Sequence, residues 1–166
     1  MCFIRNLRDY GQTDEDARAL CLAAVLASRV ETGTACAAFT GMVMLHAAQY
    51  VAERVAEAGG LDPHRSFLGL LAYCDIDDYD ADPRLVGSVV SLDGAAARAF
   101  EQSLRSEAAG ALSAGIGPVP LAAACVAMAR CMFAAFAVQN GASVAEAEGI
   151  CGAAALVRLI SYEVVH

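Results

Sequence analysis

The chain has 166 residues, the size of one ordinary domain, of which 58% are hydrophobic and about a fifth are alanine, the best helix former. Its formal net charge of −8 at pH 7 argues against direct binding to nucleic acid or to an anionic membrane surface, because both interactions need clustered Lys and Arg. All 11 basic residues are arginine, which excludes a Schiff-base lysine and a phosphate-loop lysine.

The first two predicted helices are marked by polar caps and glycines. Thr13 can cap the first helix, and the acidic residues 14–16 favour the positive end of its dipole. An apolar stripe follows at helical spacing, and Gly33 is expected to end it. A second helix is predicted from about 34 to 57, buried on most sides in its first half, with Gly59-Gly60 as its stop.

The middle of the chain, residues 62–92, is predicted to contain a short helix, an acidic loop and a segment of ambiguous structure. Asp62-Pro63 is typical of a helix cap followed by proline in the first turn, and predicts a short helix reaching about Cys74. The segment 75–83, which has the sequence DIDDYDADP, is predicted to be an acidic loop between the two halves of the chain. Residues 85–92 are compatible with a short strand, but a lone strand has no partner, so a short helix or an extended linker is preferred.

Three more helices are predicted in the C-terminal half. One runs from Asp93-Gly94 to about 114, and the next begins at Pro118 or Pro120 and reaches Gln139. This second helix is apolar nearly all round, so we expect it to be the central helix. Ser143-Val-Ala-Glu146 has the spacing of a capping box and should start the last helix.

Two apolar segments could be long enough to span a membrane. Residues 32–52 carry no Asp, Glu, Lys or Arg, and residues 119–139 carry only Arg130. A central arginine is costly in a bilayer and alanine gives little in return, so we interpret both segments as buried core helices. The N-terminal residues 1–8 are too short an apolar patch for a signal peptide.

Together these patterns predict an all-α fold, with residues 1–166 forming one compact, Ala-rich bundle of five or six helices around a central apolar helix. The seven cysteines include no C-x-x-C pair, and most lie in apolar helical runs. We therefore expect free, structural thiols in a reducing compartment, which predicts a cytoplasmic protein with no metal and no cofactor.

One helix face gathers residues that could form a pocket. His46, Gln49, Tyr50 and Glu53 lie at positions i, i+3, i+4 and i+7, so their side chains share a face. A histidine with a carboxylate two turns away could take part in acid–base chemistry or ligate a metal, although the Glu-x-x-His signature of di-metal bundles is absent. The alternative is an inert, hydrogen-bonded histidine in the core.

Arg130 is the second unusual residue, because it lies within an otherwise apolar helix. A buried guanidinium needs acceptors, and the last helix offers Glu146, Glu148 and Glu163. A structural ion pair is the expected arrangement. In the two alternatives, Arg130 binds an anion in a pocket, or the Arg130 side chain reaches the surface.

The acidic segment is the third candidate. Asp78, Asp80 and Asp82 imitate the start of a calcium loop, but Pro83 stands where that loop needs glycine and Val89 stands where it needs glutamate, so an EF-hand is rejected. A solvated loop and a weak calcium site are two alternatives. The third is a docking surface for a basic protein, made by the aspartates of this segment: Asp75, Asp77, Asp78, Asp80 and Asp82.

No catalytic signature is present, so whether the chain is an enzyme stays open. We expect a non-catalytic, acidic protein-interaction module that binds a basic protein surface, such as an inhibitor, an immunity-type protein or an assembly subunit. The alternative function is a small-molecule-binding protein or an enzyme, with a pocket between helices near His46, Tyr50, Glu53 and Arg130. A homodimer is compatible with both.

Overall fold

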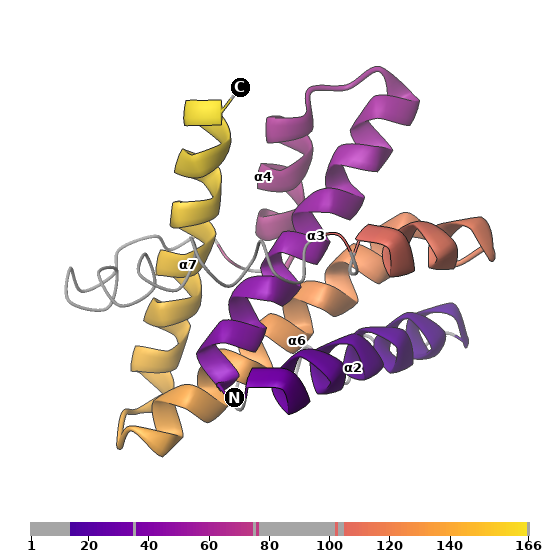
Figure 1. Cartoon of the computed structure of the whole chain (residues 1–166). Coiled ribbons are helices and arrows are strands. Elements are labelled where there is room, and N and C mark those ends of the chain that lie inside the picture. The colour runs from indigo at the N-terminus through magenta and orange to yellow at the C-terminus, as the bar shows by residue number, and fades with distance from the viewer. Residues whose placement is uncertain (1–13, 35, 75, 77–101, 103–104, 166) are drawn as a thin grey trace.

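The computed structural model describes residues 14–34, 36–74, 76, 102 and 105–165, and the described chain is all-α (Figure 1). Its helices are α2 (Asp14–Thr34), α3 (Ala37–Gly59), α4 (Pro63–Tyr73), α6 (Pro118–Gln139) and α7 (Val144–Val165). Residues 105–113 are also helical, and no strand occurs within the described ranges. The predicted compact bundle of five or six helices is therefore confirmed.

Several helix ends lie where local sequence predicts them. Asp62 Oδ1 accepts a hydrogen bond from the His64 amide at 2.9 Å, and Pro63 begins α4. Gly60 adopts a left-handed conformation with φ of 65°, which follows α3 without the steric cost that a Cβ atom would bring. Before α7, the Ser143 amide donates to Glu146 Oε2 at 2.6 Å and the Glu146 amide donates to Ser143 Oγ at 3.2 Å, which confirms the capping box.

Other boundaries differ from the sequence prediction. Gly33 lies inside α2 rather than ending it, and α3 begins at Ala37 rather than near residue 34. An isolated glycine costs a helix only about 1 kcal/mol, so its neighbours can carry the helix past it. The predicted cap Thr13, the segment 85–92 and the start of the helix predicted from 93 lie outside the described residues.

Helices α3 and α6 lie side by side at the centre, and α2, α4 and α7 pack around this pair (Figure 1). Residues 37–45 of α3 and residues 121–127 of α6 are all buried, as expected for helices that are apolar on most sides. The central position predicted for residues 118–139 is thus shared with α3. Small side chains let the two backbones approach closely.

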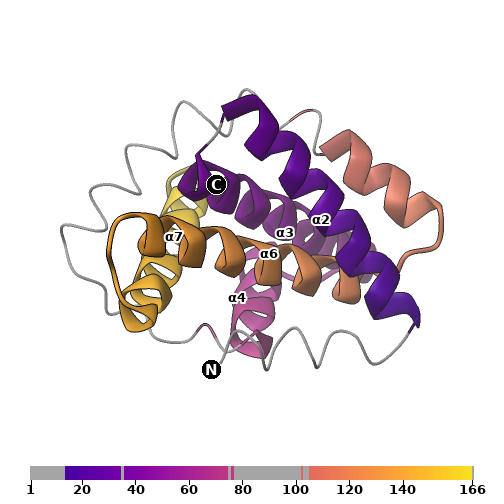
Figure 2. The same cartoon turned by 90° about the horizontal axis from the view of Figure 1, so that it is seen from below.

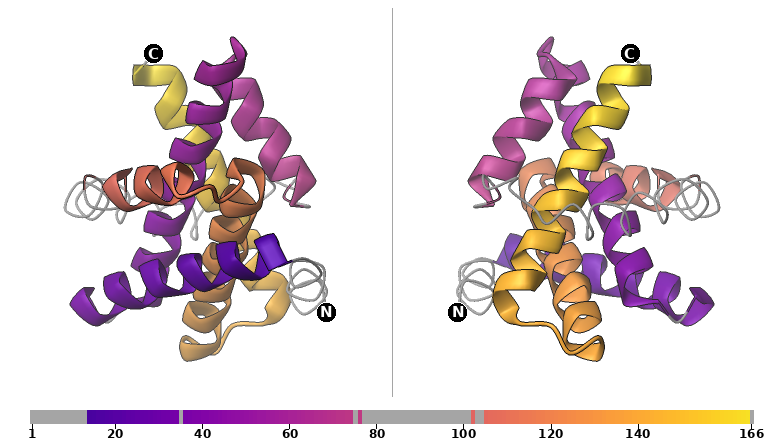
Figure 3. Two further views of the ribbon diagram at one scale, coloured as in Figure 1. Left: turned by 90° about the vertical axis from the view of Figure 1, so that its right-hand side faces the viewer. Right: turned by 90° about the vertical axis from the view of Figure 1, so that its left-hand side faces the viewer.

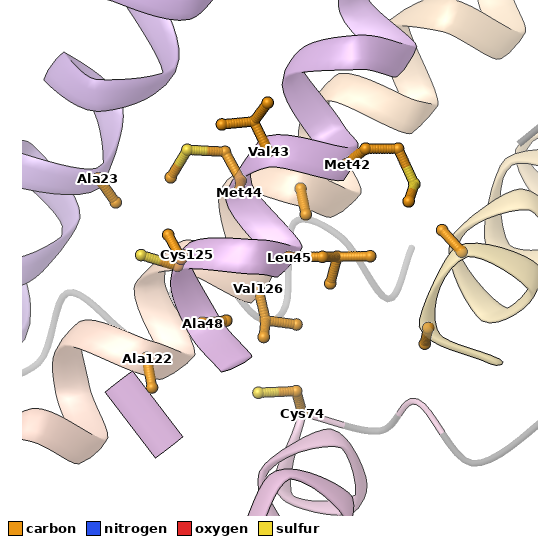
Figure 4. Packing of buried hydrophobic residues seen from close by; sticks show 14 of the residues in the cluster. Ala23, Met42, Val43, Met44, Leu45, Ala48, Cys74, Ala122, Cys125 and Val126 are labelled. Carbon is orange, nitrogen blue, oxygen red and sulfur yellow. The ribbon is translucent and has the colours of Figure 1, made fainter. Parts of the chain in front are cut away.

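The close approach is visible in the core (Figure 4). Met44 and Leu45 of α3 lie beside Cys125 and Val126 of α6, whereas Met42 points to the other side of α3. At Gly41, an added Cβ atom would lie only 2.9 Å from Phe133 Cζ, so the aromatic ring occupies the space that any larger residue would fill. This glycine is therefore required by packing rather than by backbone conformation.

Two polar contacts join α2 to other parts of the bundle. The helical residues 105–113 lie beside α2 (Figure 2), where Arg29 and Glu107 form an ion pair. The first turn of α2 reaches the start of α6, because the Gly117 amide donates to Glu15 Oε1 at 2.9 Å. An acceptor at this point suits the positive end of the α6 dipole.

Within the described part of the chain, one helix, α6, is long and apolar enough to cross a membrane by length and composition. Inside the protein, 61% of its most apolar window is buried by other helices. The core helix of a soluble protein passes the same test, so the arrangement is compatible with a soluble protein. The second apolar segment predicted from sequence, which α3 largely contains, falls short of that test.

Candidate functional site

A polar cleft opens between three elements. Helix α3 contributes the face that carries His46, Gln49, Tyr50 and Glu53, while Arg105 and Arg158 come from the helical residues 105–113 and from α7. Figure 3 shows, in its right-hand view, α7 crossing in front of α3. The cavity measures about 30 Å³, and we call it the polar cleft.

Two side chains of α3, Gln49 and Tyr50, contact the guanidinium groups of the polar cleft. Arg158 donates from Nε and from Nη2 to Gln49 Oε1, at 2.9 and 2.8 Å. The Arg105 guanidinium carbon lies over the Tyr50 ring, 5.4 Å from its centroid, which is the geometry of a cation–π contact. Both arginines are therefore held against α3 by side chains that belong to the same helix face.

Three of the four pocket residues proposed from sequence line this cleft. His46, Tyr50 and Glu53 lie on it, as their helical spacing predicts. Arg130 does not line it. The structure places Arg130 on α6, where Nη1 donates to the Cys74 carbonyl at 2.5 Å and Nη2 pairs with Glu148 Oε2 at 2.9 Å.

The ion pair predicted for Arg130 is thus confirmed, with Glu148 as its acceptor. The Arg130 side chain is 3% exposed and that of Glu148 is 38% exposed, so the pair runs from the core towards the surface. Its second bond satisfies the carbonyl at the C-cap of α4, where a positive charge suits the helix dipole. Arg130 joins α4, α6 and α7, which is a structural role.

Arg105 and Arg158 line the cleft but were not predicted from sequence. Arg158 carries the same signal as Arg130, a lone cation in a long apolar helix, and this signal could have found it. Arg105 has no such signal, because its neighbours in the sequence include several polar and charged residues. Its place at the cleft depends on how residues 105–113 pack across the bundle.

The five aspartates of the proposed docking surface lie outside the described residues, so that hypothesis stays a prediction. They are Asp75, Asp77, Asp78, Asp80 and Asp82. Among the residues that are described, no group of three or more His, Cys, Asp or Glu side chains could hold a metal ion.

A second hollow, which we call the apolar groove, lies between α3, α4 and the start of α6. Its volume is about 240 Å³, and its lining includes Val55, Leu70, Tyr73, Val119 and Ala122. Tyr73 is 66% exposed and Val119 is 50% exposed, although most large apolar residues are buried. An exposed apolar surface of this kind marks a place where another molecule can pack.

The described cysteines are free thiols, and three of them, Cys74, Cys125 and Cys151, are buried in the core. Burial raises the pKa of Cys125, and likewise that of Cys151, from an ordinary value of 9.0 to about 12. The thiolate is the nucleophilic form, so neither residue is a reactive cysteine at neutral pH. This agrees with the prediction that these thiols are structural.

We expect iodoacetamide at pH 8 to alkylate exposed Cys21 in the folded protein and to spare Cys125 and Cys151 until urea is added. The same pKa shifts predict that the free energy of unfolding falls as pH rises from about 9 towards 12, because the unfolded chain releases these protons first. Peptide mass spectrometry reads the labelling. Equal labelling rates for Cys21 and Cys125 would contradict this account.

Comparisons with known proteins found no match for this chain among family models, curated proteins or solved structures.

Proposed function

We propose that this protein binds a small anionic molecule in the polar cleft. The observation that carries this proposal is the convergence of Arg105 and Arg158, from two separate elements, on the α3 face that carries His46, Tyr50 and Glu53. In a chain with a net charge of −8, the polar cleft brings two arginines together beside one glutamate, Glu53, and guanidinium groups are the side chains best suited to bind carboxylate or phosphate anions.

The lining also supports binding rather than mere burial of charge. A guanidinium group offers five N–H donors, and both arginines are already oriented, by Gln49 and by the Tyr50 ring. Groups that are oriented before binding lose less conformational entropy when the ligand arrives. The cleft therefore presents guanidinium groups that are held in place before a ligand arrives.

Thermal unfolding with a panel of anions tests this proposal. The panel consists of acetate, succinate, citrate, phosphate and sulfate, each compared with chloride at equal ionic strength. A bound anion raises the Tm in proportion to RT ln(1 + [L]/Kd), so at least one anion should raise it as its concentration increases. Arg158→Gln and Arg105→Gln should each remove the increase, whereas Arg65→Gln, at an exposed site on α4, should keep it. If no anion raises the Tm above the chloride reference, the proposal is wrong.

A second candidate function is the cytoplasmic, acidic protein-interaction module expected from sequence. The observation that favours it is the apolar groove, because exposed Tyr73 lines it and Asp75 follows two residues later in the chain. An apolar hollow whose lining residue Tyr73 is followed in the sequence by an acidic segment would suit a basic protein partner that inserts an apolar side chain and surrounds it with Lys or Arg. The partner would be the target of an inhibitor or the neighbour in an assembly.

Native mass spectrometry of the protein purified from its own source tests this second candidate. The expected result is a stoichiometric complex with a basic protein that dissociates as salt rises. Replacing Asp77, Asp78, Asp80 and Asp82 by Asn should weaken the complex and reduce its salt dependence, whereas Tyr73→Ala should weaken it and leave the salt dependence unchanged. A bare chain or a homodimer of this chain would contradict it.

A further inference from the structure

We propose that the apolar groove is the binding site of a segment of the same chain, residues 1–13, which precede α2. The open lining of the groove, the position of the first turn of α2 beside it, and the apolar and basic residues of the segment support this assignment. Anion binding in the polar cleft does not depend on this contact.

The apolar groove is open where further side chains could pack. One wall is the face of α4 that carries Ser66, Gly69, Leu70 and Tyr73, at positions i, i+3, i+4 and i+7. At Gly69 an added Cβ atom would meet no atom of the described residues within 4 Å. An apolar cavity of about 150 Å³ accommodates a benzene ring. The groove, with a volume of about 240 Å³, therefore has room for one phenyl ring and a smaller aliphatic side chain.

The first turn of α2 lies beside one end of this groove. Glu15 accepts a hydrogen bond from the Gly117 amide at 2.9 Å, and Val119, two residues further along the chain, lines the groove. Leu7 lies seven residues before Asp14, and seven residues span roughly 23 Å when extended. The 11 residues of α4 span roughly 16 Å as a helix. The segment is therefore long enough to place its apolar residues along the groove.

The segment contains side chains of the kind that the groove can accept. Its sequence is MCFIRNLRDYGQT, and Phe3, Ile4, Leu7 and Tyr10 would share one face at helical spacing. The ring of Phe3 and the branched chain of Leu7 match the two sizes for which the groove has room. Because so short a segment cannot bury these residues by itself, they need an apolar surface elsewhere in the protein.

The segment also differs in charge from the rest of the chain. Arg5 and Arg8 against Asp9 give it a formal charge of +1, which leaves −9 of the total of −8 on residues 14–166. The first turn of α2, beside the groove, is itself acidic. Opposite charges therefore attract the segment towards the surface that contains the groove.

Covalent connection favours this occupant over a separate molecule. A tethered segment has an effective concentration on the order of 1 mM at its site, so a contact with a Kd well below that value keeps the groove filled. A partner that inserts an apolar side chain into the groove, as in the second candidate function, must first displace the segment. Residues 1–13 would then control access to the groove.

The absence of tryptophan from the sequence allows a specific probe. Phe3→Trp in the full chain introduces a single indole into the segment. When the indole packs in the groove, its emission maximum should lie at a shorter wavelength than in the urea-unfolded chain. We also expect acrylamide to quench it about threefold more slowly, because burial limits collisions with the quencher. Circular dichroism verifies that each variant is folded.

Gly69→Gln, combined with Phe3→Trp, tests whether the groove is the binding site. Gly69 is exposed and lines the groove, so the longer side chain can occupy the open space without displacing described atoms. We expect the indole then to be quenched as fast as in the unfolded chain. Gly110→Gln is the matched control, because Gly110 is also an exposed helical glycine with open space around it and does not line the groove. This variant should keep the indole protected.

The possible outcomes separate this proposal from its alternatives. Fast quenching in Phe3→Trp alone would overturn it. Protection that survives Gly69→Gln would also overturn it, because the indole would then be buried elsewhere. Protection by the same chain is independent of protein concentration, so loss of protection on dilution would assign the groove to the segment of a second copy and overturn the intramolecular contact. None of these results depends on whether an anion binds in the polar cleft.

Discussion

Truncating Phe133 to alanine is expected to lower the free energy of unfolding by about 3–5 kcal/mol, the range found for large aromatic residues in packed cores. Phe133 is 0% exposed and lies in α6, the helix that shares the centre of the bundle with α3. Its ring lies against Gly41, so truncation would leave a cavity on the main helix interface. Urea denaturation followed by circular dichroism measures the loss.

The opposite change at the same contact provides a second test. In Gly41→Ala the new Cβ atom would meet the Phe133 ring at about 2.9–3.0 Å, and overpacking of this kind costs about 1–3 kcal/mol. Gly149→Ala is the matched control, because α7 leaves open space there and alanine is the better helix former. Equal stability of the two alanine variants would show that α3 and α6 are not packed as described.

Much of the fold could be predicted because its signals are local. The cap at Asp62, the capping box at Ser143 and the proline at the start of α6 each depend on neighbours within four residues. The exact residue at which a helix ends is predicted less well, because a single glycine does not always stop it. Gly33 was expected to end α2, but the helix continues for one residue beyond it.

The polar cleft was predictable only in part. His46, Tyr50 and Glu53 share one helix face by spacing alone, so their convergence needs no tertiary information. Arg105 and Arg158 lie more than 50 residues after these α3 residues in the sequence. Their position at the cleft depends on how three elements pack together.

The sequence also could not distinguish the roles of Arg130, which is buried, and Arg158, which is partly buried. Arg130 and Arg158 are both lone cations in apolar helices, yet one pairs with Glu148 and the other with Gln49. Their partners differ because Arg130 faces the end of α4 and the start of α7, whereas Arg158 faces α3. Which helix face meets which neighbour is a property of the assembled bundle.

The Arg130–Glu148 ion pair leads to the second large prediction, in which the two partners respond differently. Glu148→Ala is expected to destabilise the protein by about 3–5 kcal/mol, because it leaves the guanidinium of Arg130, only 3% exposed, without its carboxylate. Arg130→Met is expected to cost less, about 1–3 kcal/mol. It removes the buried charge, leaves Glu148 near water and deprives the Cys74 carbonyl of one donor.

The double variant is the decisive measurement for this pair. Once methionine has replaced Arg130, loss of Glu148 removes a carboxylate that is 38% exposed and no longer has its partner, so Arg130→Met/Glu148→Ala should be no less stable than Glu148→Ala alone. Arg54→Met and Glu57→Ala, at an exposed pair on α3, should each cost under about 1 kcal/mol. Additive losses in the double variant would mean that the two side chains do not interact in solution.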